Sequence, residues 1–265
     1  DGDKVQAARR PELALQRLGA RRIDLADGWS GRASTQAAKV SAGWADPTTG
    51  ETVNTTTMAL ALSSARPREV TATVEASRMM LRQADRAEGL VRELIGLATL
   101  EEGERASVAG TGKNGQPLGL LEVGRIGVLQ RQPVAATLPT WAELTAGMQR
   151  ALNTPGCRLR STGWLLPQAD WDDYASLQRP GGNPALVEGP EGWTMAGRPV
   201  EFSEHLPSGR AIAGAFDECE MTYQGIPQLL VNPYTRSNQS VIRISVFDYM
   251  DFTVRRPQFL CLIGA

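Results

Sequence analysis

Apolar residues recur at steps of three and four along residues 76–98, and polar residues fill the positions between them. This period places the apolar side chains on one stripe of a helix. We therefore expect a long helix that begins at Ser77 as its N-cap and ends near Glu104. The residues expected to face the core are Ala76, Met80, Gln83 or Ala84, Ala87, Val91, Leu94 or Ile95, and Ala98.

Strict alternation of side chains predicts two strands, one over 68–75 and a longer one of an antiparallel pair over 241–252. Thr140 followed by Glu143 has the spacing of a capping box and predicts the start of a helix whose inward residues include Leu144 and Met148. Two shorter elements are also expected, a buried strand over 161–167 and a short helix over 170–177.

Residues 36–66 contain two β-leaning runs on either side of Asp46–Gly50, a segment with the Pro and Gly of a turn. The flanking runs consist mostly of Thr, Ala and Ser, which cannot build a core of their own. Because an isolated hairpin is unstable in water, this one needs a partner surface, either in its own domain or on another copy of the chain.

Residues 1–35 are rich in Arg, Gly and Ala and carry little apolar periodicity apart from Leu13, Leu15 and Leu18. Two interpretations stay open. The segment is either a solvated tail or an extended arm that is ordered only by neighbouring subunits.

The run Gly110–Leu121, GTGKNGQPLGLL, follows the expected helix start at Ser77 and Arg78 by some thirty residues. This combination resembles the tailed-phage major capsid protein family, which has the Hong Kong 97-type fold. Further runs continue the resemblance in the family's order, so that it covers about residues 36–265: Trp164–Leu166, Gly197–Val200, Ala211–Asp217 and Val254–Phe259.

The resemblance implies an α+β fold with a long spine helix, peripheral and axial domains, an extended hairpin loop and an N-terminal arm. It implies these divisions of the chain: 1–35 for the arm, 36–66 for the extended loop, 67–108 and 215–255 for the peripheral domain, and 109–214 with 256–265 for the axial domain.

Composition narrows the remaining possibilities. With 265 residues, 42% of them hydrophobic, the chain can bury a substantial core, and no run of 18 apolar residues predicts a membrane span. A net charge of −1 argues against a protein that binds nucleic acid by covering phosphates with cations. The three cysteines lie far apart and suit buried thiols in a reducing compartment better than disulfides: Cys157, Cys219 and Cys261.

Other chemistry has weak support in the sequence. Gly110–Gly115 satisfies the G-x-G-x-x-G pattern, but a dinucleotide site needs a preceding apolar strand and a following helix, and neither is expected here. His205 is the only histidine, and the serines beside it at 203 and 208 do not have the context of a catalytic nucleophile. Asp172/Asp173 and Glu101/Glu102 suit solvated helix positions. We predict no catalytic residue, no cofactor and no metal site.

We therefore predict a non-enzymatic major capsid protein that self-assembles into the icosahedral head of a tailed double-stranded DNA bacteriophage. The expected partners are copies of the chain arranged in pentamers and hexamers, packaged DNA contacted non-specifically, and a portal, a maturation protease and a decoration protein. The expected location is the virion, assembled in the host bacterial cytoplasm, and we expect Asp1 to be left by proteolytic maturation. The alternatives are an encapsulin-like nanocompartment or a gene-transfer-agent head and, more remotely, a cytosolic enzyme that uses the 110–115 loop.

In the prototype of the family, a hairpin lysine joins an asparagine of a neighbour with the help of an acid. Here Asp248 falls near the acid's position, but Val241 falls near the asparagine's, so we expect no covalent cross-link. An alternative role for Asp248 is simply the polar side of an alternating strand. Arg–carboxylate pairs and burial would hold the subunits together instead. The residues expected at contacts between subunits are Lys39, Trp44, Asp46, Glu51, Asn238 and Asp248.

Overall fold

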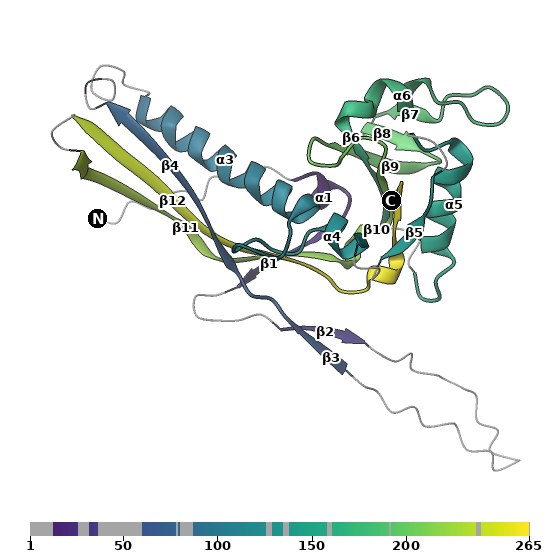
Figure 1. Cartoon of the computed structure of the whole chain (residues 1–265), viewed down its shortest axis with the longest axis horizontal. Coiled ribbons are helices and arrows are strands. Elements are labelled where there is room, and N and C mark those ends of the chain that lie inside the picture. Colours follow the sequence, from purple (N-terminus) through teal and green to yellow (C-terminus); the bar gives the residue numbers. More distant parts are fainter. Residues whose placement is uncertain are drawn as a thin grey trace, which may run out of the picture.

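The computed structural model describes residues 13–25, 32–36, 60–77, 79, 87–125, 129–134, 138–157, 161–190, 192–236 and 240–264. Figure 1 shows an elongated sheet with a long helix lying along it at one end, a second sheet at the other end, and a narrow hairpin that projects away from both. The strands of the described residues form a four-stranded sheet in the order β1-β11-β12-β4, a seven-stranded sheet in the order β5-β13-β10-β6-β9-β8-β7, and the pair β2-β3.

Two long antiparallel strands build the four-stranded sheet, β11 (Cys219–Arg236) and β12 (Val241–Val254). On one side β12 pairs with β4 (Arg68–Ser77), and on the other β11 pairs in parallel with the short β1 (Arg21–Leu25). The predicted strands over 68–75 and 241–252 are therefore confirmed. The cross-strand neighbours of β4 and β12 include an ion pair, in which Arg243 lies 2.7 Å from Glu75.

The long helix α3 (Ala87–Ala109) lies along this sheet and is about 35 Å long at about 1.5 Å per residue. The predicted start at Ser77 is wrong, because Ser77 is the last residue of β4 and pairs there with Val241 of β12. The predicted end near Glu104 is also wrong, since α3 continues to Ala109.

The inward face of α3 differs from the expected stripe. Val91 and Ile95 are buried against the sheet, as predicted, but Leu94 is 54% exposed and Ala98 is exposed as well. The face continues through small and polar residues, because the sheet comes close to the helix there. A Cβ at Gly103 would lie 2.8 Å from the sulfur of Met250 in β12. The buried positions of α3 after Ile95 are Thr99, Gly103, Ala106 and Ser107 and, near its end, Val108.

The N-terminal segment corrects a further expectation. Residues 13–25 are neither a solvated tail nor an arm ordered only by neighbouring subunits, because the short helix α1 (Ala14–Arg17) and its flanks are packed into the subunit's own core. Strand β1 then extends the sheet at β11. The three leucines noted in the sequence are all buried, since Leu13 is 6%, Leu15 0% and Leu18 3% exposed, and Ala14 and Ala20 are buried beside them.

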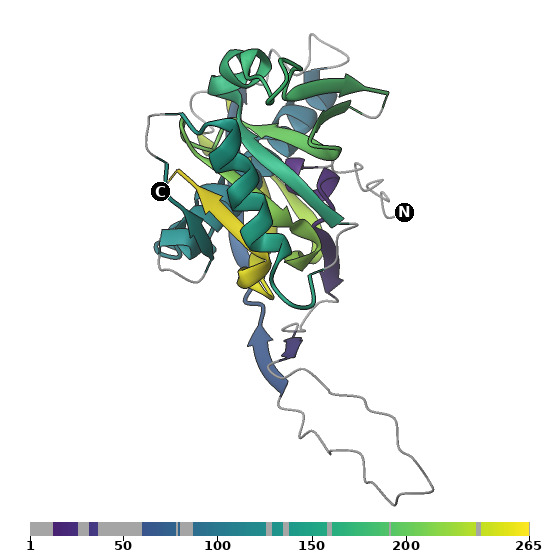
Figure 2. The same cartoon turned by 90° about the vertical axis from the view of Figure 1, so that its right-hand side faces the viewer.

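The seven-stranded sheet has a central strand, β6 (Thr162–Pro167), in which all six residues are buried. Helix α5 (Trp141–Leu152) packs against this sheet, as Figure 2 shows. Its predicted capping box is confirmed, since Thr140 N–H donates to Glu143 Oε2 at 2.8 Å and Glu143 N–H donates to Thr140 Oγ1 at 3.4 Å. The other strands are β5 (Gln130–Gln132), β7 (Leu186–Gly189), β8 (Gly192–Met195), β9 (Arg198–Ser203), β10 (Ala211–Ala215) and β13 (Leu260–Ile263).

Two short helices complete this end of the molecule. The predicted helix over 170–177 is confirmed as α6 (Trp171–Ser176), preceded by the 3₁₀ turn η2 (Gln168–Asp170). Helix α4 (Leu120–Arg125) follows the glycine-rich run. No described helix has both the length and the apolar character needed to cross a lipid bilayer.

Candidate functional site

The hairpin β2 (Arg32–Gln36) and β3 (Leu60–Ser64) projects from the body on one side, and both views show it clear of the two larger sheets (Figures 1 and 2). Its strands pair antiparallel, with Arg32 opposite Ser64 and Gln36 opposite Leu60. These strand pairs form the base of the hairpin. The predicted turn and four of the expected contact residues lie outside the described residues: 46–50, Lys39, Trp44, Asp46 and Glu51.

The point where the hairpin joins the body is held by a buried carboxylate. Asp251 of β12 is 7% exposed, and its Oδ2 accepts the backbone N–H of Arg66 at 2.7 Å. Its Oδ1 accepts the N–H of Phe252 at 2.9 Å. Burial raises the pKa of the Asp251 carboxyl, while the two N–H groups and the charge of Arg68 act in the opposite direction.

Strand β11 carries a row of exposed apolar side chains. Strand β1 pairs with β11 only from Glu220 to Gln224, so the edge of its outer half that faces away from β12 has no partner strand among the described residues. Large apolar side chains there are open to solvent, which is costly unless another surface covers them. The exposed fractions are 69% for Ile226, 54% for Leu230 and 81% for Tyr234, and Val231, which points to the opposite face from Leu230, is 45% exposed.

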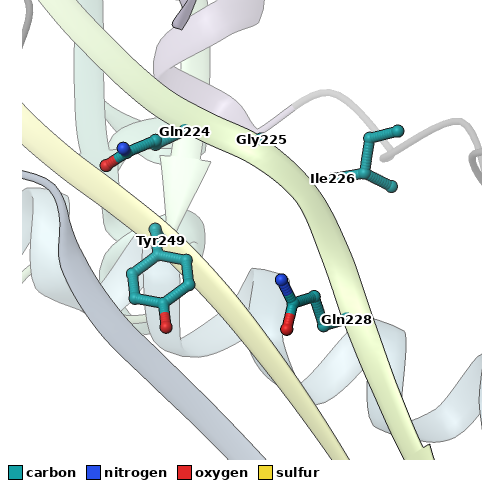
Figure 3. A pocket seen from close by; sticks show the side chains of 5 residues that line it. All are labelled: Gln224, Gly225, Ile226, Gln228 and Tyr249. Atoms are coloured by element: carbon teal, nitrogen blue, oxygen red, sulfur yellow. The ribbon is translucent and has the colours of Figure 1, made fainter. Parts of the chain in front are cut away.

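The row begins at an irregularity in β11. Between Gln224 and Gln228 the register with β12 shifts, and Gly225 has a φ of 67°. Figure 3 shows the shallow hollow at this bulge, whose volume is about 120 Å³ and which is lined by Gln224, Gly225, Ile226, Gln228 and Tyr249. Small-molecule sites usually enclose about 300 to 1,000 Å³, so this hollow is too small to be a cofactor pocket.

Asp248 lies in the part of β12 opposite this bulge and pairs with Val70 of β4. It is 7% exposed, and its Oδ1 accepts the N–H of Tyr249 at 2.9 Å. In the single subunit, Asp248 is thus a buried member of the strand. Asn238, the other expected contact residue of this region, lies outside the described residues.

Two ion pairs fix the junction of the two sheets. The chain crosses between them at the 3₁₀ turns η3 (Phe216–Glu218) and η5 (Pro257–Phe259). Arg256 Nε donates to Glu218 Oε2 at 2.9 Å, and its guanidinium lies 4.9 Å from the ring centroid of Phe259. The second pair joins Arg255 to Glu220 at 3.3 Å. Burial raises the pKa of Glu220, and Arg255 and Arg21 oppose that shift.

The backbone N–H groups of Gly110, Gly112 and Gly119 in the glycine-rich run donate hydrogen bonds to nearby backbone carbonyls. The N–H of Gly110 donates to Ala106 O at 2.9 Å, that of Gly112 to Pro117 O at 3.1 Å, and that of Gly119 to Gly110 O at 2.9 Å. A phosphate loop needs such N–H groups directed at the ligand. A Cβ at Gly119 would lie 2.4 Å from Gly110 N, so the glycines allow the end of α3 to pack closely against the start of α4.

The serine beside the single histidine is also engaged. Ser203 is 1% exposed, donates to Glu104 Oε1 at 3.2 Å and accepts the backbone N–H of His205 at 3.3 Å. The side chain of His205 therefore has no part in holding this hydroxyl. No cluster of three or more metal-ligating side chains occurs in the part of the chain that the structure describes.

The sequence profile of the family described as the phage capsid family matches residues 3–263, nearly the whole chain. The chain belongs to the phage capsid family. A search among curated proteins found no match. As a phage capsid protein, the chain has a structural role in a shell, and the expected resemblance is confirmed.

Solved capsid structures share the fold across the full chain at low sequence identity. The capsid of an empty GTA particle superposes with a TM-score of 0.76 at 15% identity and covers 100% of this chain and 94% of its own. The capsid of a native GTA particle gives 0.73 at 14% identity, with 100% and 95% covered. A chain from Gordonia phage Cozz gives 0.69 at 12% identity, with 96% and 86% covered. The predicted α+β capsid fold is therefore confirmed.

Three of the structural features described above were not predicted from the sequence. They are the carboxylate of Asp251 at the hairpin base, the exposed apolar row on β11, and the ion pairs at the junction. Asp251 was visible only as one of several acids in an alternating strand. The exposed row could not be inferred, because its exposure depends on which face of β11 packs on α3, where Leu229 contacts the cluster of Val91 and Ile95.

Proposed function

We propose that this phage capsid protein is the major capsid subunit of a tailed double-stranded DNA phage and that it self-assembles into the icosahedral head around the genome. The observation that carries the proposal is the match of the family across residues 3–263. The role is structural and requires no catalytic residue, cofactor or metal.

The shape of the subunit supports assembly through other copies of itself. The β2–β3 hairpin makes its strand pairs outside both larger sheets, and the outer half of β11 leaves Ile226, Leu230 and Tyr234 open to water. Neither feature is stabilising in an isolated chain. Many copies, arranged as pentamers and hexamers, would cover these surfaces, so that stability comes from the assembled shell.

The proposed division of the chain fits the two sheets. The proposed peripheral domain, 67–108 and 215–255, would contain β4, β11, β12 and nearly all of α3, while β1 of the same sheet comes from the proposed arm; the proposed axial domain, 109–214 and 256–265, would contain the seven-stranded sheet. The proposed extended loop, 36–66, starts too late, because the first hairpin strand β2 begins at Arg32 and pairs with β3. Of the proposed arm, 1–35, residues 13–25 pack in the subunit's own body and residues 32–35 belong to the hairpin.

The proposed partners follow from a head that packages DNA. They are the enclosed double-stranded DNA, contacted non-specifically, a portal, a maturation protease and a decoration protein, with assembly in the bacterial cytoplasm. Direct contacts between subunits are proposed for Lys39, Trp44, Asp46, Glu51, Asn238 and Asp248.

A gene-transfer-agent head is the second candidate, and one observation favours it. The two GTA capsids superpose with TM-scores of 0.73 and 0.76, whereas the phage chains from Gordonia phage Cozz and Mycobacterium phage Cain give 0.69 and 0.68. Since all four identities are at or below 15%, this likeness concerns the fold.

Sequencing the nucleic acid inside purified particles separates the candidates. A single repeated genome is expected for the phage head, and a mixture of fragments of the producing cell's DNA would indicate a gene-transfer-agent head. Particles without DNA would contradict both and favour a nanocompartment. In parallel, deletion of residues 44–52 should leave a folded, soluble subunit that cannot close shells, and normal shells from this variant would contradict the proposed role of the hairpin.

A further inference from the structure

At the point where the hairpin leaves the sheet, a hydrogen bond to a side chain replaces a backbone hydrogen bond between strands. The pairing of β4 with β12 ends where Arg68 lies opposite Met250. The next residue toward the hairpin, Pro67, has no N–H to donate. The N–H of Arg66 comes next, and it donates to the side chain of Asp251 at 2.7 Å rather than to the backbone of β12.

A charged residue at this position needs a reason. Asp251 is 7% exposed and lies between Met250 and Phe252, which are 3% and 2% exposed, in a strand whose neighbours are mostly apolar. Burying a carboxylate is costly unless hydrogen bonds compensate for lost water. Asp251 gains two such bonds, one to Phe252 N–H at 2.9 Å within its own strand and one to Arg66 N–H, which belongs to the segment that leads into the hairpin.

The segment between the hairpin and the sheet is short. Strand β3 ends at Ser64 and β4 begins at Arg68, so only residues 65–67 connect them. Ala65 is 6% exposed and seated in the body, and Pro67 has a restricted backbone. Ala65 is buried, Pro67 is stiff and the Arg66 amide is held, so these three residues restrain the hairpin at its β3 end, which continues into β4 (Figure 1).

We propose that Asp251 is a positioning residue for assembly, which holds the amide of Arg66 and thereby fixes the direction in which the β2–β3 hairpin leaves the subunit. This inference rests on the proposed function, because a fixed direction matters where the hairpin must meet a neighbouring copy. Asp251 acts through the backbone at the hairpin base and does not itself touch the neighbour.

Two measurements on the full chain test the inference. The first is hydrogen–deuterium exchange with single-residue resolution on the soluble subunit. In Asp251→Ala the Arg66 amide should exchange faster by on the order of 10- to 100-fold, the range that the loss of a hydrogen bond to a charged group allows. Amides in the centre of the β11–β12 pairing should keep their rates. Arg66→Ala is the matched control, because it removes the side chain and retains the backbone N–H.

The second measurement is the yield of closed shells by electron microscopy. Asp251→Ala should fold and form few closed shells, whereas Arg66→Ala should form them at the wild-type yield. Asp251→Asn keeps one acceptor oxygen in place of two and serves if Asp251→Ala fails to fold; it should show an intermediate increase in Arg66 exchange and an intermediate yield.

The outcomes separate this inference from the proposed function. Unchanged exchange of Arg66 in both Asp251 variants, or wild-type shell yield from variants whose Arg66 amide is released, would overturn the inference. Absence of shells from the wild-type chain would instead contradict the proposed function, and the exchange of Arg66 would then still test whether Asp251 holds the hairpin base.

Discussion

The exposed row on β11 offers a direct perturbation of self-association. Replacing Ile226 and Leu230 together by serine removes apolar side chains that are 69% and 54% exposed in the single chain. Because both are largely in solvent already, the free energy of unfolding of the subunit should change by less than about 1 kcal/mol.

The effect on association should be much larger. Fully burying a Leu or Ile side chain contributes about 1.5 to 3 kcal/mol, and these two have more than half of that burial still to gain from a neighbour. Together they would contribute about 2 to 4 kcal/mol per subunit, which corresponds to a 30-fold to several-hundred-fold weaker contact at about 1.4 kcal/mol per factor of ten. Every subunit of a shell would lose this contribution.

The assay is the protein concentration at which shells appear, followed by light scattering and checked by electron microscopy, with circular dichroism to monitor subunit folding. Gln228→Ser is the matched control, since Gln228 is exposed on the same strand and contributes little apolar area. A double variant that folds normally and assembles at the wild-type concentration would refute the reasoning, and so would an equal defect in Gln228→Ser.

Three further predictions follow from the junction, the hairpin and the buried acid. Glu218→Gln should lower the free energy of unfolding by about 2 to 4 kcal/mol in denaturant titrations, slightly below the cost of breaking a fully buried pair because the Arg256 side chain is 27% exposed; an unchanged midpoint would contradict this role of the pair. Boiled particles should give one band near 28.6 kDa on a denaturing gel, because no acceptor amide is expected opposite the hairpin lysine, and a ladder of linked chains would contradict that expectation. The folded-state pKa of Asp251 is raised, so over the pH range between the two pKa values the folded chain holds more protons than the unfolded chain. The free energy of unfolding of the wild type, relative to that of Asp251→Asn, should therefore fall as pH rises from about 3.8 through the raised pKa. A relative free energy of unfolding that stays constant or grows over this interval would contradict the prediction.

Elements with strong local signals were predicted correctly from the sequence. The capping box of Thr140 and Glu143 and the alternation over 68–75 and 241–252 depend on neighbouring residues alone, and each is present as expected. The order of the family's motifs predicted the α+β capsid fold, which pattern alone would not have given at identities of 12% to 15%.

Elements defined by distant contacts were predicted less well. The inward face of α3 passes through Thr99 and Gly103, and only the approach of Met250 explains why a glycine belongs there. The leucines at 13, 15 and 18 form too short a pattern to identify a packed segment, because their burial depends on a sheet formed some 200 residues later. An antiparallel partner was expected for the strand over 241–252 but was not located in the sequence, since the bulge near Gly225 interrupts the alternation of β11.

The candidate surface was the least predictable part. An acid at the end of a run of β-forming residues gives no sign of which N–H it will accept, and the bond from Arg66 to Asp251 spans 185 positions of the chain. The apolar side chains at Ile226 and Leu230 look like core residues in the sequence, and their exposure depends on how α3 packs on the sheet, where Leu229 and not Leu230 joins the cluster of Val91 and Ile95.

The central claim is that this chain builds a closed shell from many copies of itself. Negative-stain electron microscopy of the purified full chain, with its mass in solution from analytical ultracentrifugation, tests that claim most directly. The account predicts uniform closed particles that sediment as assemblies of many 28.6 kDa subunits. A protein that stays monomeric or dimeric at all concentrations, with no particles in the images, would contradict it.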